Sequence, residues 1–297
     1  MDLDRAYIEP LIDDWMEHLQ QTMKKHEQGQ EQSVNAIDFA MPFVGDTIPA
    51  STVKAAFKIA EYLELEPNVK YMAIQLYDKF MCKHFWEIYK TEIANDPSEA
   101  FKVCKKTCNQ TKLNLMSCFQ LACKMDSHSS ALGISQILNI LYLIDKESEY
   151  TRNMISSSEI KVFKTVGFKM PLYTPLHCIE ILLAATGLGE TPNVFNISID
   201  LLDMAYLKHD RLYSQFDLYY MHKDVNTEHV AEKLISLKSN ILFLSAAIVY
   251  CTMFFLCLDT NISEEQIIIT KLAELSNTTN IDISNMANTL LSIATQE

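Results

Sequence analysis

The chain has 297 residues, 48% of them hydrophobic and 21% charged, which is enough apolar material for a large core and too much for a disordered protein. Only 6 glycines and 8 prolines interrupt it, so turn-rich β-sandwiches and glycine-loop nucleotide folds are disfavoured and helical bundles are favoured. A formal charge of −13 repels phosphate backbones, so we expect no direct binding to nucleic acid.

Amphipathic periodicity predicts the helices in chain order, beginning with one over residues 1–28. The polar stretch 28–33 and the prolines Pro42 and Pro49 separate it from the rest of the chain. Apolar residues recur along this N-terminal helix at a spacing near four: Leu3, Tyr7, Leu11, Trp15 and Leu19.

Two sets of five amphipathic helices follow. In each set the third helix is the most apolar and the richest in small side chains, so four others can pack closely around it. The sequence therefore predicts an all-α protein in which two five-helix repeats follow an N-terminal helix. The connection 82–111 is longer than usual, and its pattern predicts helical extension and an inserted surface element. The predicted helices are 51–65, 68–81, 112–125, 131–144 and 156–168, then 174–188, 197–213, 239–258, 263–276 and 282–295.

Helix starts are indicated by residues that cap an N-terminus well. Ser51, Thr174 and Ser263 are predicted N-caps, and Pro175 fits the first helical position after Thr174. The spacing also has capping-box form at two places, Ser156 with Glu159 and Ser263 with Gln266.

The most apolar stretch, 239–258, has twenty residues without a charge, which is near the length that spans a bilayer. It also carries serine, asparagine, threonine, tyrosine and cysteine side chains, and few basic residues flank it. A helix that is apolar all round is equally typical of the centre of a helical bundle. We therefore predict a buried core helix and no association with a membrane.

The eight cysteines include no CxxC pair, and residues 1–15 lack the basic and apolar regions of a signal peptide. We therefore expect an intracellular chain with reduced, buried thiols. Cys104 and Cys108 have a helix-face spacing that suits two metal ligands, but no second pair of donors follows at a suitable distance.

The sequence has no motif of a catalytic site. The histidines are not spaced as metal ligands, and no nucleophile motif or complete glycine-rich loop occurs. The sequence predicts no cofactor and no enzymatic activity.

Three segments resemble the cyclin family. SCFQLACKM (117–125) is similar to the signature of the cyclin central helix, and LYDKF (76–80) to the end of the second cyclin helix. Residues 157–183 resemble the stretch that closes the first cyclin box and opens the second. The resemblance implies a cyclin fold, with an N-terminal helix and linker over 1–49 and cyclin boxes over 50–170 and 171–297.

The resemblance also implies a binding site. In kinase-activating cyclins, a lysine that ends the central helix and a glutamate that opens the fifth helix contact a helix of the kinase. These positions fall on Lys124 and Glu159, and the apolar residues Met125, Phe163 and Met170 would supply contact area. Both charged residues also have a structural interpretation, since Lys124 would stabilise a helix C-terminus and Glu159 would complete a capping box.

Segments 56–81, 115–125 and 201–213 are similar to a divergent cyclin of meiotic crossover formation. This likeness implies a regulator that is found in the nucleus, where it can associate with chromosomes, and also in the cytoplasm. It would act in meiotic recombination, with a cyclin-dependent kinase as its partner. The alternative is a kinase-independent scaffold that recruits crossover and clamp-loader factors. A third hypothesis is direct nucleic-acid binding, which some double cyclin folds perform. The net charge of −13 argues against it. Residues 53–59 also lack the motif with which cell-cycle cyclins dock substrates.

Overall fold

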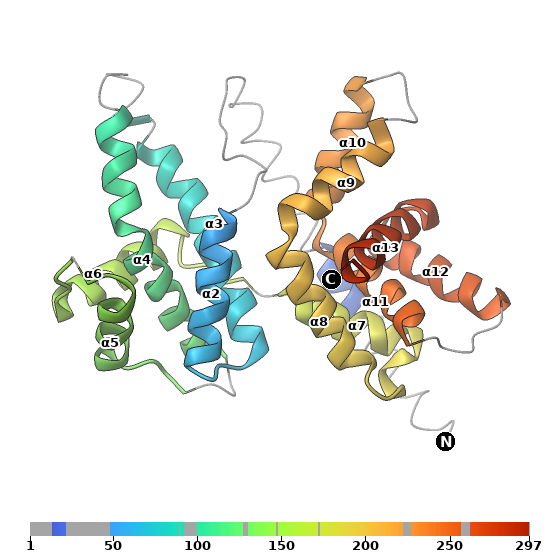
Figure 1. Ribbon diagram of the computed structural model, residues 1–297, viewed down its shortest axis with the longest axis horizontal. Coiled ribbons are helices and arrows are strands. Elements are labelled where there is room, and N and C mark those ends of the chain that lie inside the picture. Colours follow the sequence, from blue (N-terminus) through green and yellow to red (C-terminus); the bar gives the residue numbers. More distant parts are fainter. Residues whose placement is uncertain are drawn as a thin grey trace. The chain divides into compact units, whose positions relative to one another are not determined.

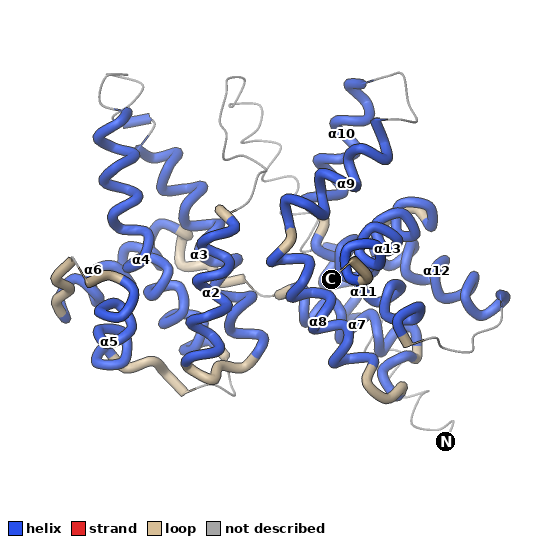
Figure 2. Tube along the Cα trace, in the orientation of Figure 1, coloured by secondary structure: helices blue, strands red, loops and turns tan. Residues whose placement is uncertain are grey.

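The computed structural model describes residues 14–21, 48–88, 90–91, 100–126, 130–146, 148–171, 173–221, 227–256 and 262–296. Every regular element within these ranges is a helix, as Figure 2 shows. The predicted all-α class is confirmed. The chain divides into two compact units, which we call the first unit (Thr47–Thr174) and the second unit (Pro175–Glu297 together with the helix over 14–21).

The first unit contains the five helices that the sequence predicts, in the same order (Figure 1). The third of them, α4, is the central helix, and it packs against α3, α5 and α6. From Leu113 to Cys123 every residue of α4 is buried, which is possible because several of these side chains are small. The helices are α2 (Ala50–Tyr62), α3 (Pro67–Ile88), α4 (Ala100–Met125), α5 (Ile134–Ile144) and α6 (Arg152–Thr165).

The segment 82–111 is largely taken up by extensions of its two neighbouring helices. Helix α3 continues to Ile88, and α4 already begins at Ala100. The predicted helical extension is thus confirmed at both ends. Residues 92–99 lie outside the described residues, as do the side chains of 100–109, which include Cys104 and Cys108.

A buried polar contact joins α4 to α6. The Ser117 hydroxyl donates to Ser158 Oγ at 2.8 Å, and the Ser158 hydroxyl donates to Asn114 Oδ1 at 3.2 Å. All three residues are less than 10% exposed. Because each bond satisfies a polar atom that water cannot reach, the contact fixes the register of the two helices.

Replacing Ser158 by alanine is expected to lower the unfolding free energy by about 1–3 kcal/mol, because the Asn114 oxygen would lose its buried donor. Denaturant unfolding measures the change. The exposed Ser157→Ala, one residue earlier on α6, is the control and should stay within about 0.5 kcal/mol of the wild type. Equal losses in the two variants would contradict a stabilising role for the buried contact.

Among its described residues from Pro175 onward, the second unit has seven α-helices, two more than predicted there. The predicted helix 197–213 is two helices, because α8 ends at Leu207 and α9 begins at His209. Helix α10 follows, lies against α9 and has no counterpart among the predicted helices (Figure 1). The elements are α7 (Pro175–Thr186), the 3₁₀ turn η3 (Leu188–Glu190), α8 (Val194–Leu207), α9 (His209–Met221), α10 (Thr227–Ser239), α11 (Ile241–Phe255), α12 (Ile262–Ser276) and α13 (Asn280–Ala294).

The apolar segment predicted at 239–258 forms α11, the central helix of the second unit. It packs against α7, α8, α12 and α13, and 11 of its 15 residues are buried. Its N-cap is Asn240, whose Oδ1 accepts from the N–H groups of Leu242 and Phe243.

No single helix in the described ranges is long and apolar enough to cross a membrane. The bent pair Val230–Ser239 and Ile241–Phe255 is long and apolar enough when the two helices are taken together, and the angle between them is 78°.

The helix over 14–21 belongs to the second unit. Met16 and Leu19 are buried, and Gln20 Nε2 donates to the Leu275 carbonyl at 2.9 Å. Trp15 is 63% exposed, so its predicted place on the buried stripe is wrong. The bond from Gln20 shows that this helix contacts α12, of which Leu275 is part. Leu3, Tyr7 and Leu11 lie outside the described residues.

Several helix starts differ from the predicted caps. Helix α6 begins earlier than predicted because Thr151, in an extended conformation, accepts from the Met154 N–H and serves as its N-cap. Residues Ser156 and Glu159 therefore lie inside α6 and form no capping box. Pro49 precedes α2, so Ser51 lies in its first turn, and Ser263 lies inside α12. Helix α7 begins at Pro175, directly after Thr174, as predicted.

Four cysteines, Cys118, Cys123, Cys178 and Cys251, are buried free thiols, as expected. Burial raises the pKa of Cys178 and Cys251 to about 12, so these thiols stay protonated and unreactive at neutral pH. The thiol of Cys82 is exposed, so the prediction of burial is wrong there.

Candidate protein-binding site

Lys124 and Glu159, the two charged residues singled out in the sequence, form an ion pair with each other. Lys124 lies in the last turn of α4, next to its final residue Met125. Its ammonium group donates to Glu159 Oε1 of α6. The contact joins two residues that are 35 positions apart in the chain.

Glu159 lies well inside α6 and not at its start, which corrects the predicted position. Ile155, Ser158 and Val162 are the buried residues of this helix. Glu159 flanks that buried stripe, so its carboxylate emerges at the edge of the contact between α6 and α4. The Lys124 side chain is 46% exposed and that of Glu159 is 16% exposed.

The pair keeps unused hydrogen-bonding capacity. A lysine ammonium has three N–H donors and a carboxylate has two acceptor oxygens. Within the described part of the chain, the bond between Lys124 and Glu159 Oε1 is the one hydrogen bond that either side chain makes. A partner could therefore accept from Lys124 and donate to Glu159 without breaking the pair.

Exposed apolar side chains lie next to Lys124 and Glu159 in the chain and in the turn after α6. Met125 is 57% exposed, Ile160 is 55% exposed and Phe168 is 61% exposed. Phe163 follows Glu159 by one helical turn, is partly buried, and packs edge-on against Phe168 with ring centroids 5.1 Å apart. Apolar area next to a hydrogen-bonding pair is typical of a protein-binding surface.

A tight turn presents Phe168. Gly167 and Phe168 both have left-handed backbones, with φ of 74° and 59°. The Phe168 N–H donates to the Phe163 carbonyl at 2.9 Å, which closes the last turn of α6. This conformation is uncommon for a residue with a side chain, and here it turns an aromatic ring back onto α6. Met170, also predicted for the site, lies beyond this turn and is partly buried.

Sequence reasoning did not select Ile160 and Phe168. Ile160 departs from the period of the buried residues Ile155, Ser158 and Val162 on α6, and that departure was the available signal for it. Phe168 lies in the turn after α6, which ends at Thr165, so the helical period gave no signal for it.

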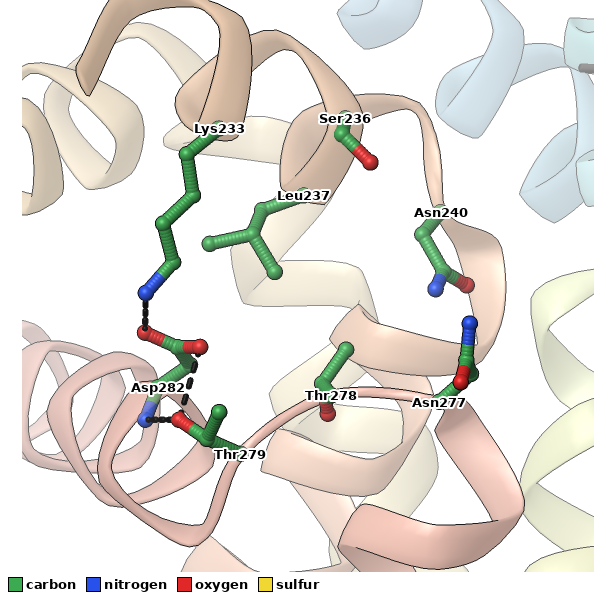
Figure 3. A pocket seen from close by; sticks show the side chains of 8 residues that line it. All are labelled: Lys233, Ser236, Leu237, Asn240, Asn277, Thr278, Thr279 and Asp282. Carbon is green, nitrogen blue, oxygen red and sulfur yellow. Dashed lines mark hydrogen bonds and ion pairs between the residues drawn. The ribbon is translucent and has the colours of Figure 1, made fainter. Parts of the chain in front are cut away.

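The second unit has a polar pocket of about 360 Å³ between α10 and the turn from α12 to α13 (Figure 3). Its carboxylate, Asp282, is already paired with Lys233 Nζ at 2.8 Å. Its asparagine Asn240 caps α11 and donates to the Ser276 carbonyl. Because these groups already stabilise the fold, we assign no chemistry to the pocket. The described residues also include no cluster of three or more side chains that could hold a metal ion.

Comparison with known proteins agrees with this architecture. Residues 18–171, more than half of the chain, match the N-terminal domain of cyclins. The chain belongs to the cyclin family. The predicted cyclin fold is thereby confirmed, and the Lys124–Glu159 pair lies within the matched domain.

Two curated relatives have the same description. The chain is 25% identical over 234 residues to the mouse protein called cyclin N-terminal domain-containing protein 1, a span of 75% of this chain and 70% of the relative. The human protein of that name matches with the same identity and the same coverage. Cyclin domains are typically non-catalytic regulators that bind other proteins.

Proposed function

We propose that this cyclin binds a cyclin-dependent kinase through the Lys124–Glu159 surface and regulates it, without catalysing a reaction itself. The observation that carries the proposal is the ion pair between α4 and α6, held by rigid helices and bordered by Met125, Ile160 and Phe168. A cation and a carboxylate at a fixed separation match the carbonyl and amide groups at the end of a partner helix. The apolar neighbours supply area that is desolvated on binding.

The proposed setting is meiotic recombination and crossover maturation in the nucleus. Its support is the distant likeness to cyclin N-terminal domain-containing protein 1, together with the sequence segments 56–81 and 201–213. If this cyclin binds no kinase, the same likeness favours a scaffold that recruits crossover and clamp-loader factors. Purification from meiotic tissue, followed by identification of the bound proteins, distinguishes the two.

Charge exchange at the pair tests the kinase-binding surface. The reversals Lys124→Glu and Glu159→Lys each place like charges together, and the double exchange restores an ion pair with the opposite direction. We expect each single reversal to lower the unfolding free energy by about 0.5–1 kcal/mol, since Lys124 is half exposed, and the double exchange to recover it. Binding to a panel of purified cyclin-dependent kinases should fall in all three variants by about 2 kcal/mol, or roughly thirtyfold.

The ion pair between Lys112 and Asp145 is a closely matched control. It lies in the same unit, its atoms are 3.2 Å apart, and its side chains are 46% and 12% exposed. Exchanging these two charges should leave kinase binding unchanged. If kinase binding instead recovers with stability in the Lys124→Glu/Glu159→Lys protein, the pair serves only the fold and the proposed surface is wrong.

A further inference from the structure

Two lysines of α3 converge on the turn that ends α6. Lys79 and Lys83 are one helical turn apart, so they lie on one face of α3. The Lys79 ammonium donates to the Lys169 carbonyl at 3.2 Å. Lys83 Nζ lies 4.0 Å from the place that a Cβ on Gly167 would occupy. With Lys169 itself, three ammonium groups gather around residues 167–169, and we call these three the lysine cluster.

The charges of this cluster are crowded. Partial burial lowers the pKa of Lys79, and the neighbouring charges of Lys83 and Lys169 lower it further. Lys161 of α6 also reaches α3, where its ammonium lies 3.0 Å from Nε2 of His84. Gathering cations in this way costs electrostatic free energy in the unbound protein.

Nearby carboxylates do not relieve this repulsion. Asp78 and Glu87 are the acidic residues of α3, and neither pairs with the lysine cluster in the described ranges. Within the described ranges, the bond from Lys79 to a backbone carbonyl is the one polar contact that the cluster makes with the protein. This is unusual in a chain whose net charge is −13.

Stabilisation of a helix end does not account for the cluster. Lysines near a helix C-terminus interact well with its last carbonyls, and α6 already has Lys164 in its last turn. The partial charge at a helix C-terminus is about −0.5 of an elementary charge. Half a negative charge cannot balance three further ammonium groups, so the cluster retains a net positive charge.

We propose that the lysine cluster binds the phosphate of a phosphorylated serine or threonine in a partner protein. Three ammonium groups around one turn suit a single compact anion with about two negative charges and several acceptor oxygens. A nucleic acid is the less suitable source of phosphate, because a long polyanion would extend beyond the cluster over an acidic surface. The site lies on α3 and the end of α6, and it does not depend on the kinase proposal.

A binding experiment with the full chain tests the assignment. The probe is a fluorescent peptide pool with one fixed phosphothreonine and randomised flanks, compared with the same pool carrying threonine. We expect the phosphorylated pool to bind at least about tenfold more tightly, with competition by inorganic phosphate and weakening at high salt. In the variant Lys79→Gln/Lys83→Gln/Lys169→Gln, that preference should disappear.

The control variant Lys54→Gln/Lys58→Gln/Lys271→Gln removes the same charge from exposed lysines elsewhere, so both variants have a net charge of −16 instead of −13. The control should keep its preference for the phosphorylated pool. Loss of repulsion should leave the melting temperature of the cluster variant at or above that of the control, which excludes unfolding as the cause. Equal losses in the two variants, no preference for phosphothreonine, or tighter binding of a DNA duplex than of the phosphorylated pool would each overturn the proposal.

Discussion

Replacing Phe243 by alanine should lower the unfolding free energy of the second unit by about 3–5 kcal/mol. Phe243 is 0% exposed on the central helix α11, and its ring centroid lies 5.7 Å from that of the equally buried Phe216 on α9. Truncation removes the apolar transfer free energy of the ring. It also leaves a cavity that the surrounding helices cannot fill, because α7, α8 and α13 pack on the same helix.

The two tryptophans allow this loss to be assigned to one unit. Trp15 lies on the helix of the second unit and Trp86 lies on α3 of the first unit, and the chain has no other tryptophan. In a Trp86→Phe background, the denaturant transition of Trp15 fluorescence should move to lower concentration when Phe243 is replaced. Phe255→Ala, the same change at a 40% exposed position of α11, is the control and should cost at most about 1 kcal/mol.

Phe216→Ala and the double variant extend the test to α9, the helix that the sequence did not separate from α8. If the two rings contact each other as described, the double variant should lose less than the sum of the single losses, by about 0.5–1.5 kcal/mol. Strictly additive losses would show that α9 does not depend on α11 for its packing.

Replacing Asp282 by alanine should lower the unfolding free energy by about 2–3 kcal/mol at neutral pH. Asp282 is 2% exposed in the first turn of α13. It accepts hydrogen bonds from Lys233 at 2.8 Å, from Thr279 at 2.8 Å and from the Tyr220 hydroxyl, as Figure 3 shows for the first two. Lys233 is 42% exposed and can be hydrated after the change, which keeps the loss below that of a fully buried pair.

The loss should depend on pH in a defined direction. Burial alone would raise the pKa of Asp282, but the hydrogen bonds from Lys233, Tyr220 and Thr279 outweigh it and hold this pKa below its usual 3.8. A lowered pKa in the folded state means that the carboxylate stabilises the protein fully above pH 3.8 and loses this effect as the pH falls through the folded value.

Unfolding free energies of the wild type and of Asp282→Ala, measured between pH 7 and pH 3, should therefore move closer together as the pH falls below 3.8. The exposed Asp200→Ala on α8 is the control and should differ from the wild type by less than about 0.5 kcal/mol throughout. A difference between Asp282→Ala and the wild type that stays constant down to pH 3 would show that the ionised carboxylate is not what stabilises α13.

Much of the candidate site could be inferred from the sequence. Lys124 and Glu159 were selected by their match to cyclin positions, and the structure brings them together. Ile160 and Phe168 were missed, because their exposure depends on which faces of α6 and of the turn after it the other helices leave uncovered. Helix α6 also starts earlier than predicted, at Arg152. The cap that sets this start, Thr151, competed with Ser156, and a local pattern does not say which hydroxyl the chain will use.

The sequence alone determined the helical class, the helices of the first unit and the two apolar central helices α4 and α11. These follow from periodicity and composition, which are local properties that each helix carries along its own length. The tertiary structure decided the break between α8 and α9 at Lys208, the presence of α10, and the exposure of Trp15. It also decided the ion pair of Lys124 with Glu159 and the convergence of Lys79 and Lys83 on the end of α6. Each of these depends on which helix faces meet, and residues far apart in the chain become neighbours only through the packing of one helix on another.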